Sequence, residues 1–175
     1  MTLRDDSDLA RLTDALLSAA RKAGATEADA VAVAAEALSV DVRAGALEHA
    51  ERAEGVEIGL RVLIGGRQAC VSASDRSTRT IEEMAQRAVA MAREAPVDDA
   101  VGLAAPDQLA DLRDGAGLEL EDGRPAPEPD LLLDLALRAE AAALGVEGVR
   151  IAEAASASSM TRRLWLAGSN GFSGG

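Results

Sequence analysis

The chain is nearly free of aromatic side chains: among its 175 residues it has no tyrosine, one tryptophan, Trp165, and one phenylalanine, Phe172. Hydrophobic residues nevertheless make up 48% of the sequence, so any core has to be built from Leu, Val, Ile and Ala. This composition is typical of a folded protein and differs from that of disordered chains. The length is sufficient for one or two domains with a real core.

Cysteine and histidine each occur only once, as Cys70 and His49. A single cysteine cannot form an internal disulfide, and a single histidine cannot supply a two-histidine metal site. No second histidine is present to activate the thiol, so we expect Cys70 to be buried and unreactive. We expect His49, which Glu48 and Glu51 flank, to be a surface residue of a strand. The sequence therefore predicts no catalytic, cofactor-binding or metal-ligating residue.

Basic residues are also scarce, with 18 Lys and Arg against 30 Asp and Glu, for a net charge of −12. Nucleic-acid binders need a basic stripe to displace counterions from phosphates, so this class is excluded. No apolar run is long enough to span a membrane, and the acidic N-terminus lacks the features of a signal peptide. We therefore expect a cytoplasmic protein with neither nucleic acid nor membrane as a partner. Most of the negative charge lies in residues 96–147, which contain 13 acidic and three basic residues.

The N-terminal part predicts helices packed on a sheet. Leucines at spacings of three and four indicate an amphipathic helix over residues 7–23, with Gly24 as its C-terminal cap. Residues 28–44 are ambiguous, because Ala and Glu favour a helix whereas the valines alternate as in a strand. We predict a strand there, with a bulge near residues 35–37 where the alternation changes phase. Three further strands are predicted, over residues 47–53, 56–64 and 67–73.

The strongest local signal is Gly65-Gly66, a two-residue connection between strands 56–64 and 67–73 that is typical of a tight hairpin. The same glycines are not a phosphate loop, because no Gly-Lys-Ser/Thr follows them. Thr80 and Glu83 form a capping-box pattern at the start of a helix that extends to Pro96. This amphipathic helix is expected to cover one face of the sheet.

The C-terminal part contains one more helix and two strands. The helix is predicted to begin after Pro129 with Asp130 as its cap, and the strands to span residues 149–157 and 162–167. We expect the buried face of this helix to consist of Leu132, Leu135, Ala136, Ala139 and Ala143. Asn170-Gly171 is a hairpin-turn pattern, yet only three residues follow Phe172, so the returning strand is missing and the chain looks cut.

These elements predict an α+β fold with a mostly antiparallel sheet, containing the hairpin 56–73, covered by amphipathic helices and followed by the start of a second α/β segment. We expect an N-terminal α+β domain over residues 1–105, an acidic, Gly- and Pro-rich linker over 106–129, and the incomplete beginning of a central domain over 130–175. The carboxylate pairs Asp98-Asp99 and Glu121-Asp122 are explained by solvated loop charge.

The segment Gly55–Asp75, followed by the helix that ends at Pro96, resembles the N-terminal domain of the TldD/PmbA family, and specifically its PmbA (TldE) branch. Further matching features are the helix that contains Glu140, the strand pair around Arg150-Ile151, and Ser169-Asn170-Gly171-Phe172, which is similar to the family's Ser-Asn-Gly-Phe segment. Family members continue well past that segment, through a central and a C-terminal domain.

This resemblance implies a subunit of a cytoplasmic, two-component metalloprotease. The TldD-like partner carries the zinc-binding His-Glu-x-x-x-His helix, whereas the PmbA/TldE subunit lacks it and completes a heterodimer that admits unfolded or short peptides. Members are associated with peptide-antibiotic maturation, with antitoxin degradation and with modulation of DNA gyrase. The resemblance thus places zinc on the partner, assigns no cofactor or catalytic residue to this chain, and implies a dimer for the full-length form. The alternative is a peptide- or protein-binding module without enzymatic activity.

Overall fold

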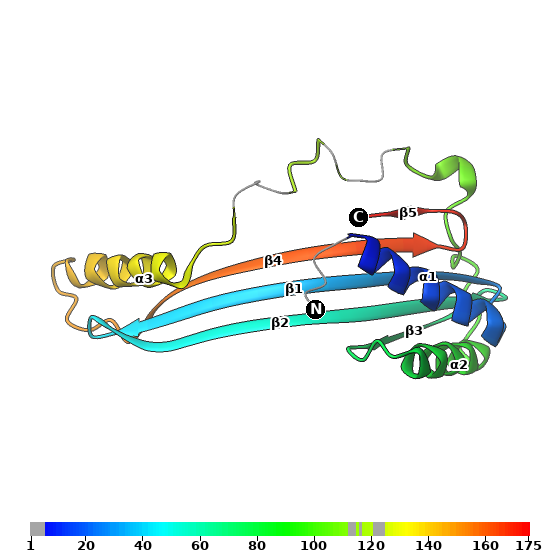
Figure 1. Cartoon of the computed structure of the whole chain (residues 1–175), viewed down its shortest axis with the longest axis horizontal. Coiled ribbons are helices and arrows are strands. Elements are labelled where there is room, and N and C mark those ends of the chain that lie inside the picture. Colours follow the sequence, from blue (N-terminus) through cyan, green and yellow to red (C-terminus); the bar gives the residue numbers. More distant parts are fainter. Residues whose placement is uncertain (1–5, 112–114, 116, 121–124) are drawn as a thin grey trace. The chain divides into compact units, whose positions relative to one another are not determined.

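The computed structural model describes residues 6–111, 115, 117–120 and 125–175. These residues form an α+β fold with a five-stranded antiparallel sheet of order β3-β2-β1-β4-β5 and three α-helices (Figure 1), which confirms the predicted fold class. The elements in chain order are α1 (Asp6–Ala23), β1 (Glu27–Arg43), β2 (Ala46–Ile64), β3 (Arg67–Ala73), α2 (Thr78–Glu94), the short 3₁₀ helix η1 (Pro106–Gln108), α3 (Pro129–Leu144), β4 (Ala155–Gly168) and β5 (Ser173–Gly174).

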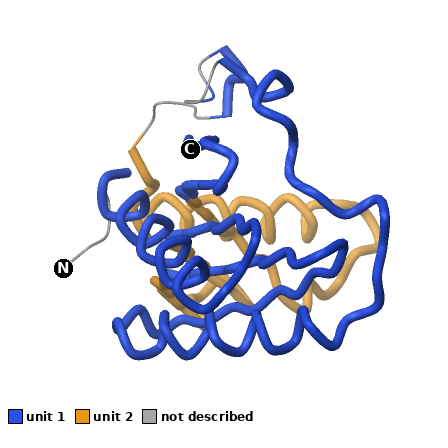
Figure 2. Tube along the Cα trace, turned by 90° about the vertical axis from the view of Figure 1, so that its right-hand side faces the viewer, with its two compact units in different colours: residues 1–34, 56–121, 163–175 blue, residues 35–55, 122–162 orange. Residues whose placement is uncertain are grey.

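The chain divides into two compact units, coloured separately in Figure 2. Unit 1 comprises residues 1–34, 56–121 and 163–175, and unit 2 comprises residues 35–55 and 122–162. Each unit therefore contains segments far apart in the sequence. The domain division predicted at residues 105 and 129 remains a prediction.

The core of unit 1 lies between two helices and one face of the sheet. Leu9 and Leu16 of α1 are fully buried, as are the alanines at the centre of α2. On β1 the residues that join this core are Ala28, Ala30 and Ala32. Small residues here let the helices approach the sheet closely, which explains how a core whose buried residues include no aromatic side chain is filled; Trp165 packs against this core and is partly buried.

The change of phase predicted in β1 near residues 35–37 is absent, because the buried residues of this strand are all at even-numbered positions. The prediction relied on Val31 and Val33, but both are only half-buried. Their alanine neighbours face the core instead. Burial in β1 thus follows helix packing rather than side-chain size.

The hairpin predicted at Gly65-Gly66 is confirmed. Both glycines have positive φ, 56° and 73°, and β2 and β3 pair antiparallel from Ile58↔Ala73 to Ile64↔Arg67. Positive φ at both central residues gives a turn whose twist matches that of the flanking strands, and glycine adopts it without steric cost.

Helix α2 begins earlier than predicted. Its N-cap is Ser77, whose side chain accepts a hydrogen bond from the backbone N–H of Thr80; the predicted cap at Thr80 is therefore wrong. Asp75 reinforces this start by accepting hydrogen bonds from the Ser77 backbone N–H and from both nearby hydroxyls. These bonds, above all the one from Thr80, hold the pKa of Asp75 below its ordinary value of 3.8.

Strand β2 is continuous, whereas two strands over 47–53 and 56–64 were predicted. Gly55 does not break it, since its backbone stays extended alongside the neighbouring strand β1. The turn that joins β1 to β2 is formed by Ala44 and Gly45, with φ of 51° and 74°. Alanine rarely adopts this conformation, so the sequence carried no clear signal for the turn.

Unit 2 is a two-layer arrangement of α3 on β1 and β4. Its small core contains four buried residues, Val40, Val42, Leu132 and Ala136. The buried side of α3 is completed by Glu140, which is 3% exposed. Leu135, Ala139 and Ala143 are exposed, contrary to the prediction, because the buried positions recur every fourth residue along one line of the helix.

Two details of unit 2 also differ from the prediction. The N-cap of α3 is Glu128, with Pro129 in the first turn, rather than Asp130; proline suits the first helical position because its missing N–H would have no partner there. β4 is a single strand that begins at Ala155, whereas two strands were predicted. The residues between those two predicted strands belong to β4, because the neighbouring strands of the sheet form hydrogen bonds with its backbone.

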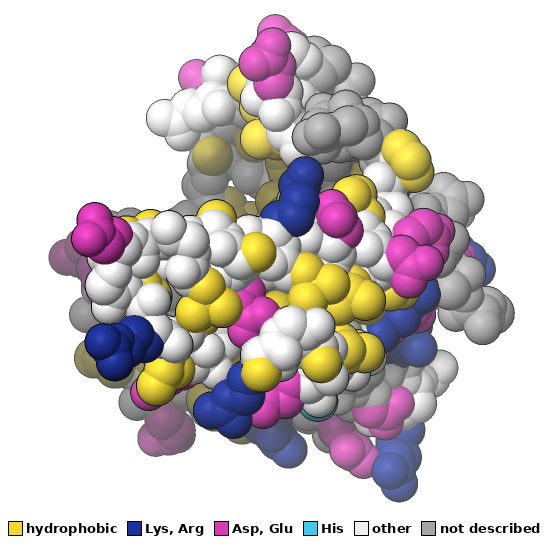
Figure 3. Space-filling model, turned by 90° about the vertical axis from the view of Figure 1, so that its left-hand side faces the viewer, with side chains coloured by type: hydrophobic (Ala, Val, Ile, Leu, Met, Phe, Trp, Pro, Cys, Tyr) yellow, Lys and Arg dark blue, Asp and Glu magenta, His cyan; other side chains and the backbone are white. Residues whose placement is uncertain are grey.

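Hydrophobic side chains are also exposed on unit 2. Figure 3 shows several of them between charged ones on the side where α3 ends. The exposed large hydrophobic residues of this unit are Leu47, Leu131, Leu135, Leu144, Val146, Val149, Ile151 and Met160.

The turn near the C-terminus is followed by a short strand. β5 pairs antiparallel with β4 through Leu166↔Gly174 and Ala167↔Ser173, so the prediction of a missing strand is wrong.

The two carboxylate pairs singled out in the sequence lie in loops or outside the described residues. Asp98 accepts a hydrogen bond from the Ala100 N–H of its own loop at 2.9 Å, and Glu121-Asp122 lies outside the described residues. None of the described helices is long and apolar enough to cross a membrane.

Candidate functional site

Unit 1 also contains an open pocket of about 810 Å³ on the sheet face that points away from α1 and α2. Side chains alternate between the two faces of a strand, so the residues between the core positions form its floor: Asp29, Val31, Gly59, Arg61, Cys70 and Ser72. The segment 102–110 forms the opposite wall, and the turn after β4 closes one side.

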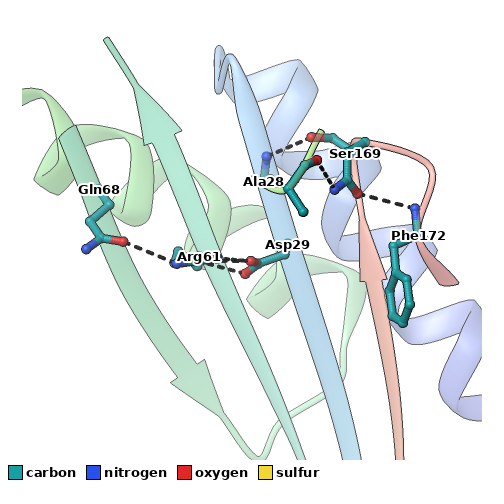
Figure 4. Close-up of polar contacts among 8 residues, drawn as sticks. Ala28, Asp29, Arg61, Gln68, Ser169 and Phe172 are labelled. Atoms are coloured by element: carbon teal, nitrogen blue, oxygen red, sulfur yellow. Dashed lines mark hydrogen bonds and ion pairs between the residues drawn. The ribbon is translucent and has the colours of Figure 1, made fainter. Parts of the chain in front are cut away.

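An ion pair crosses the floor of this pocket (Figure 4). Arg61 of β2 donates from Nε to both oxygens of Asp29 on β1, at 3.2 and 3.0 Å, and its Nη2 also donates to Oδ2. Its Nη1 lies 3.4 Å from Oε1 of Gln68 on β3. Arg61 is 36% and Asp29 32% exposed. The hydrogen bond with Asp29 raises the pKa of Arg61, and partial burial opposes this effect.

Two hydrogen bonds connect the turn 168–172 to the start of β1. The Ala28 N–H donates to Ser169 Oγ at 3.0 Å, and the Ser169 N–H donates to the Ala28 carbonyl at 2.8 Å (Figure 4). Within the turn, the Phe172 N–H donates to Asn170 Oδ1 at 3.2 Å. The segment Ser169–Phe172, which carried part of the family resemblance, therefore has a structural role: it positions Phe172 at the pocket.

The outer wall is held at two points. Asn170 Nδ2 donates to the Ala104 carbonyl at 2.9 Å, and the Asp98 N–H donates to the Gly66 carbonyl at 2.7 Å. Between these anchors the chain places Leu103 against the pocket. The wall is thus fixed both to the β2–β3 hairpin and to the turn after β4.

The cysteine and the histidine of the chain lie in different units. Cys70 is exposed, so the prediction that its thiol is buried is wrong. Cys70 lies opposite Arg61 in the β2–β3 register, on the pocket face, whereas its neighbour Ala69 joins the core. His49 is a surface strand residue as predicted, 60% exposed, with Nε2 3.9 Å from Oε2 of Glu51. In the described part of the chain, no group of three or more His, Cys, Asp or Glu is placed to hold a metal ion.

Sequence reasoning did not find this pocket. Its charged residues are 32 positions apart, and the wall and the turn come from still later segments. One signal was available: Gly59 interrupts the non-core face of β2 next to Arg61. A glycine between alternating residues of a strand often marks a close approach or an open space.

Comparison with known proteins defines the class. Residues 28–92 match the model of the PmbA/TldA metallopeptidase domain 1. The metalloprotease PmbA homolog of Haemophilus influenzae is 32% identical over 139 residues, which cover 79% of this chain and 30% of that protein. These matches confirm the resemblance to the PmbA/TldD family, and the matched model is that of its first domain.

Solved structures share the fold. A modulator of DNA gyrase from Bacteroides thetaiotaomicron, so described, has a TM-score of 0.78 at 20% identity, covering 97% of this chain and 38% of that one. TldE from Thermococcus kodakarensis has a TM-score of 0.70 at 14% identity, covering 93% and 36%. A similarly described modulator from Thermotoga maritima has a TM-score of 0.67 at 16% identity, covering 93% and 36%. The chain spans about a third of the length of these relatives.

Proposed function

We propose that this chain is the N-terminal part of a PmbA/TldE-like subunit, which partners a zinc-bearing TldD-like subunit in the proteolysis of unfolded or short peptides in the cytoplasm. The observation that carries this proposal is the similarity to the metalloprotease PmbA homolog, since it extends over 79% of the chain. The fold likeness to TldE supports the same branch.

The residues of the chain are consistent with a supporting role. A zinc site of the His-Glu-x-x-x-His kind needs two histidines on one helix, and the sequence contains only His49, on the surface of β2. In this proposal the partner subunit therefore supplies the metal and its ligands. This chain contributes a folded scaffold beside the shared cavity, and no residue of it is assigned a catalytic role.

The test combines the full-length protein that carries this chain with a TldD-type partner. We expect the mixture to elute as one complex in size-exclusion chromatography and to cleave an unfolded substrate, such as reduced and carboxymethylated lactalbumin, faster than the partner alone. A chelator should abolish cleavage, and native lactalbumin should resist it. No complex and no stimulation would refute the proposal.

A second candidate is a binding module without proteolysis, and the edge of the sheet favours it. β3 is the outermost strand next to β2, so its free side has backbone groups that an extended peptide can pair with. Binding of unfolded lactalbumin by the full-length protein, with no cleavage in any partnered mixture, would favour this module over a peptidase subunit.

A further inference from the structure

The pocket of unit 1 combines an apolar lining with a single charged pair. Apolar side chains reach it from three separate segments: Val31 from β1, Leu103 and Leu109 from the outer wall, and Leu166 and Phe172 from the region around the β4 turn. Among the described residues that line it, only Asp29 and Arg61 are charged. Such a lining is typical of sites that enclose an apolar group and orient it through a few polar contacts.

Arg61 has hydrogen-bonding capacity to spare. A guanidinium has five N–H donors, and the contacts of Arg61 engage Nε–H, one N–H of Nη2 and, at the long distance of 3.4 Å, one N–H of Nη1. One N–H on each terminal nitrogen is left. The two terminal nitrogens can together donate to the two oxygens of a carboxylate, and the side chain is exposed enough for a ligand to reach.

Gly59 leaves room beside this guanidinium. A Cβ atom at this position would lie 2.9 Å from Cγ1 of Val31, closer than real contacts allow. Glycine therefore lets Val31 cover the floor where a larger residue of β2 would project. The apolar floor and the arginine lie next to each other on β1 and β2.

From this arrangement we propose that the pocket binds an apolar ligand through its terminal carboxylate, which Arg61 holds while the apolar group lies between Val31, Leu103 and Phe172. Two sources share this chemistry: the C-terminal residue of an apolar peptide and a medium-chain carboxylic acid. The described lining residues all belong to unit 1, and the test needs neither a partner subunit nor cleavage. Its failure would leave the proposed function standing.

Cys70 provides the readout. It is the only cysteine in the sequence, it is exposed, and it lines the pocket opposite Arg61. A bound ligand should therefore slow its reaction with a maleimide. The ligands are N-acetyl-Leu-Leu as the free acid and as the amide, and octanoate with octanamide. They are added to the full-length protein, with the modification of Cys70 followed by peptide mass spectrometry.

We expect at least one free acid to protect Cys70 in a saturable manner, and the matching amide to need at least about tenfold more for the same protection, since a charged hydrogen-bonded pair is lost. The acid that protects at the lower concentration identifies the source of the ligand. Equal protection by acid and amide, or none by either acid, would overturn the proposal.

Three variants sharpen the result. Arg61→Gln should raise the half-protecting concentration of the acid at least about tenfold, because a neutral amide cannot form the charged pair. Asp29→Asn should lower it or leave it unchanged, since it removes the carboxylate that competes for Arg61. Arg52→Gln makes the same change of charge in unit 2, where Arg52 pairs with Glu36 and Glu54, and should have no effect.

Circular dichroism spectra and melting curves establish that each variant is folded. If Arg61→Gln does not fold, the comparison of acid and amide on the unaltered protein decides alone. If Arg52→Gln weakened binding of the acid as much as Arg61→Gln does, the effect would come from the overall charge. That result would contradict the assignment of carboxylate binding to Arg61.

Discussion

The two units of the molecule are stabilised in different ways. In unit 1, two helices pack on three strands around a continuous core that contains fully buried leucines. In unit 2, one helix covers four buried residues, and all ten residues of β2 from Ala46 to Gly55 are exposed. Arg52 forms ion pairs there with the half-buried Glu36 and the exposed Glu54. Because buried apolar area is the main source of stability, unit 1 should hold most of the free energy of unfolding.

The largest expected effect is in the core of unit 1. Leu16→Ala should lower the free energy of unfolding by about 2–5 kcal/mol, because it leaves a cavity at a fully buried position. Urea denaturation followed by circular dichroism measures this loss. Leu131→Ala, at a position 51% exposed, is the control and should change little. If Leu16→Ala lowered the free energy of unfolding less than the control does, the core around Leu16 would not be the main source of stability.

The corresponding change in unit 2 should be weaker. Leu132→Ala truncates a side chain that is 3% exposed, but the small core around it can partly collapse, so we expect about 2 kcal/mol, the lower end of such losses. Hydrogen exchange should show lost protection within residues 35–55 and 129–162 and unchanged protection in α1 and α2. Equal loss of protection in the two units would show that they unfold together and would contradict this expectation.

The turn between β1 and β2 depends on a polar contact from α3. Glu140 Oε2 accepts a hydrogen bond from the Gly45 N–H at 2.8 Å, while its buried Oε1 has no hydrogen-bond partner among the residues that the structure describes. Glu140→Ala should cost about 1 kcal/mol and speed exchange of the Gly45 amide. Glu140→Gln retains an acceptor oxygen and should protect that amide better than alanine does. The same exchange rate in both variants would show that the contact is unimportant.

The smallest effect is expected at the start of α2, and it depends on pH. Since the pKa of Asp75 is lower in the folded state than its ordinary value of 3.8, its carboxylate stabilises the fold above that value. The contribution is lost as the pH falls through the lowered pKa. Melting temperatures measured from pH 6 down to pH 2 should therefore decline less in Asp75→Asn than in the parent. Parallel curves would refute a contribution from Asp75.

Sequence reasoning succeeded where one local signal decided the structure. Gly65-Gly66 predicted its hairpin because positive φ favours glycine, and the spacing of leucines predicted α1 almost to its ends. The predicted strand ends at residues 44 and 47 lie within one residue of the observed turn, but the left-handed conformation of Ala44, in a turn that Glu140, 95 residues away, also contacts, was not predicted. The pocket was missed for the same reason: Asp29 and Arg61 come together only through strand pairing, and the turn after β4 brings Phe172 to the same pocket. Interactions between distant segments leave little trace in a local pattern.

The hairpin formed by β1 and β2 contributes residues to both units, and this bears on how its length can differ between related proteins. Residues 35–55 are the far end of one antiparallel hairpin, whose base lies in unit 1. Removing opposed pairs of residues from the tip of a hairpin preserves the face on which every remaining side chain lies, because strand side chains alternate with a period of two. The reach of this hairpin can therefore vary among homologous proteins without disturbing the helices packed at its base.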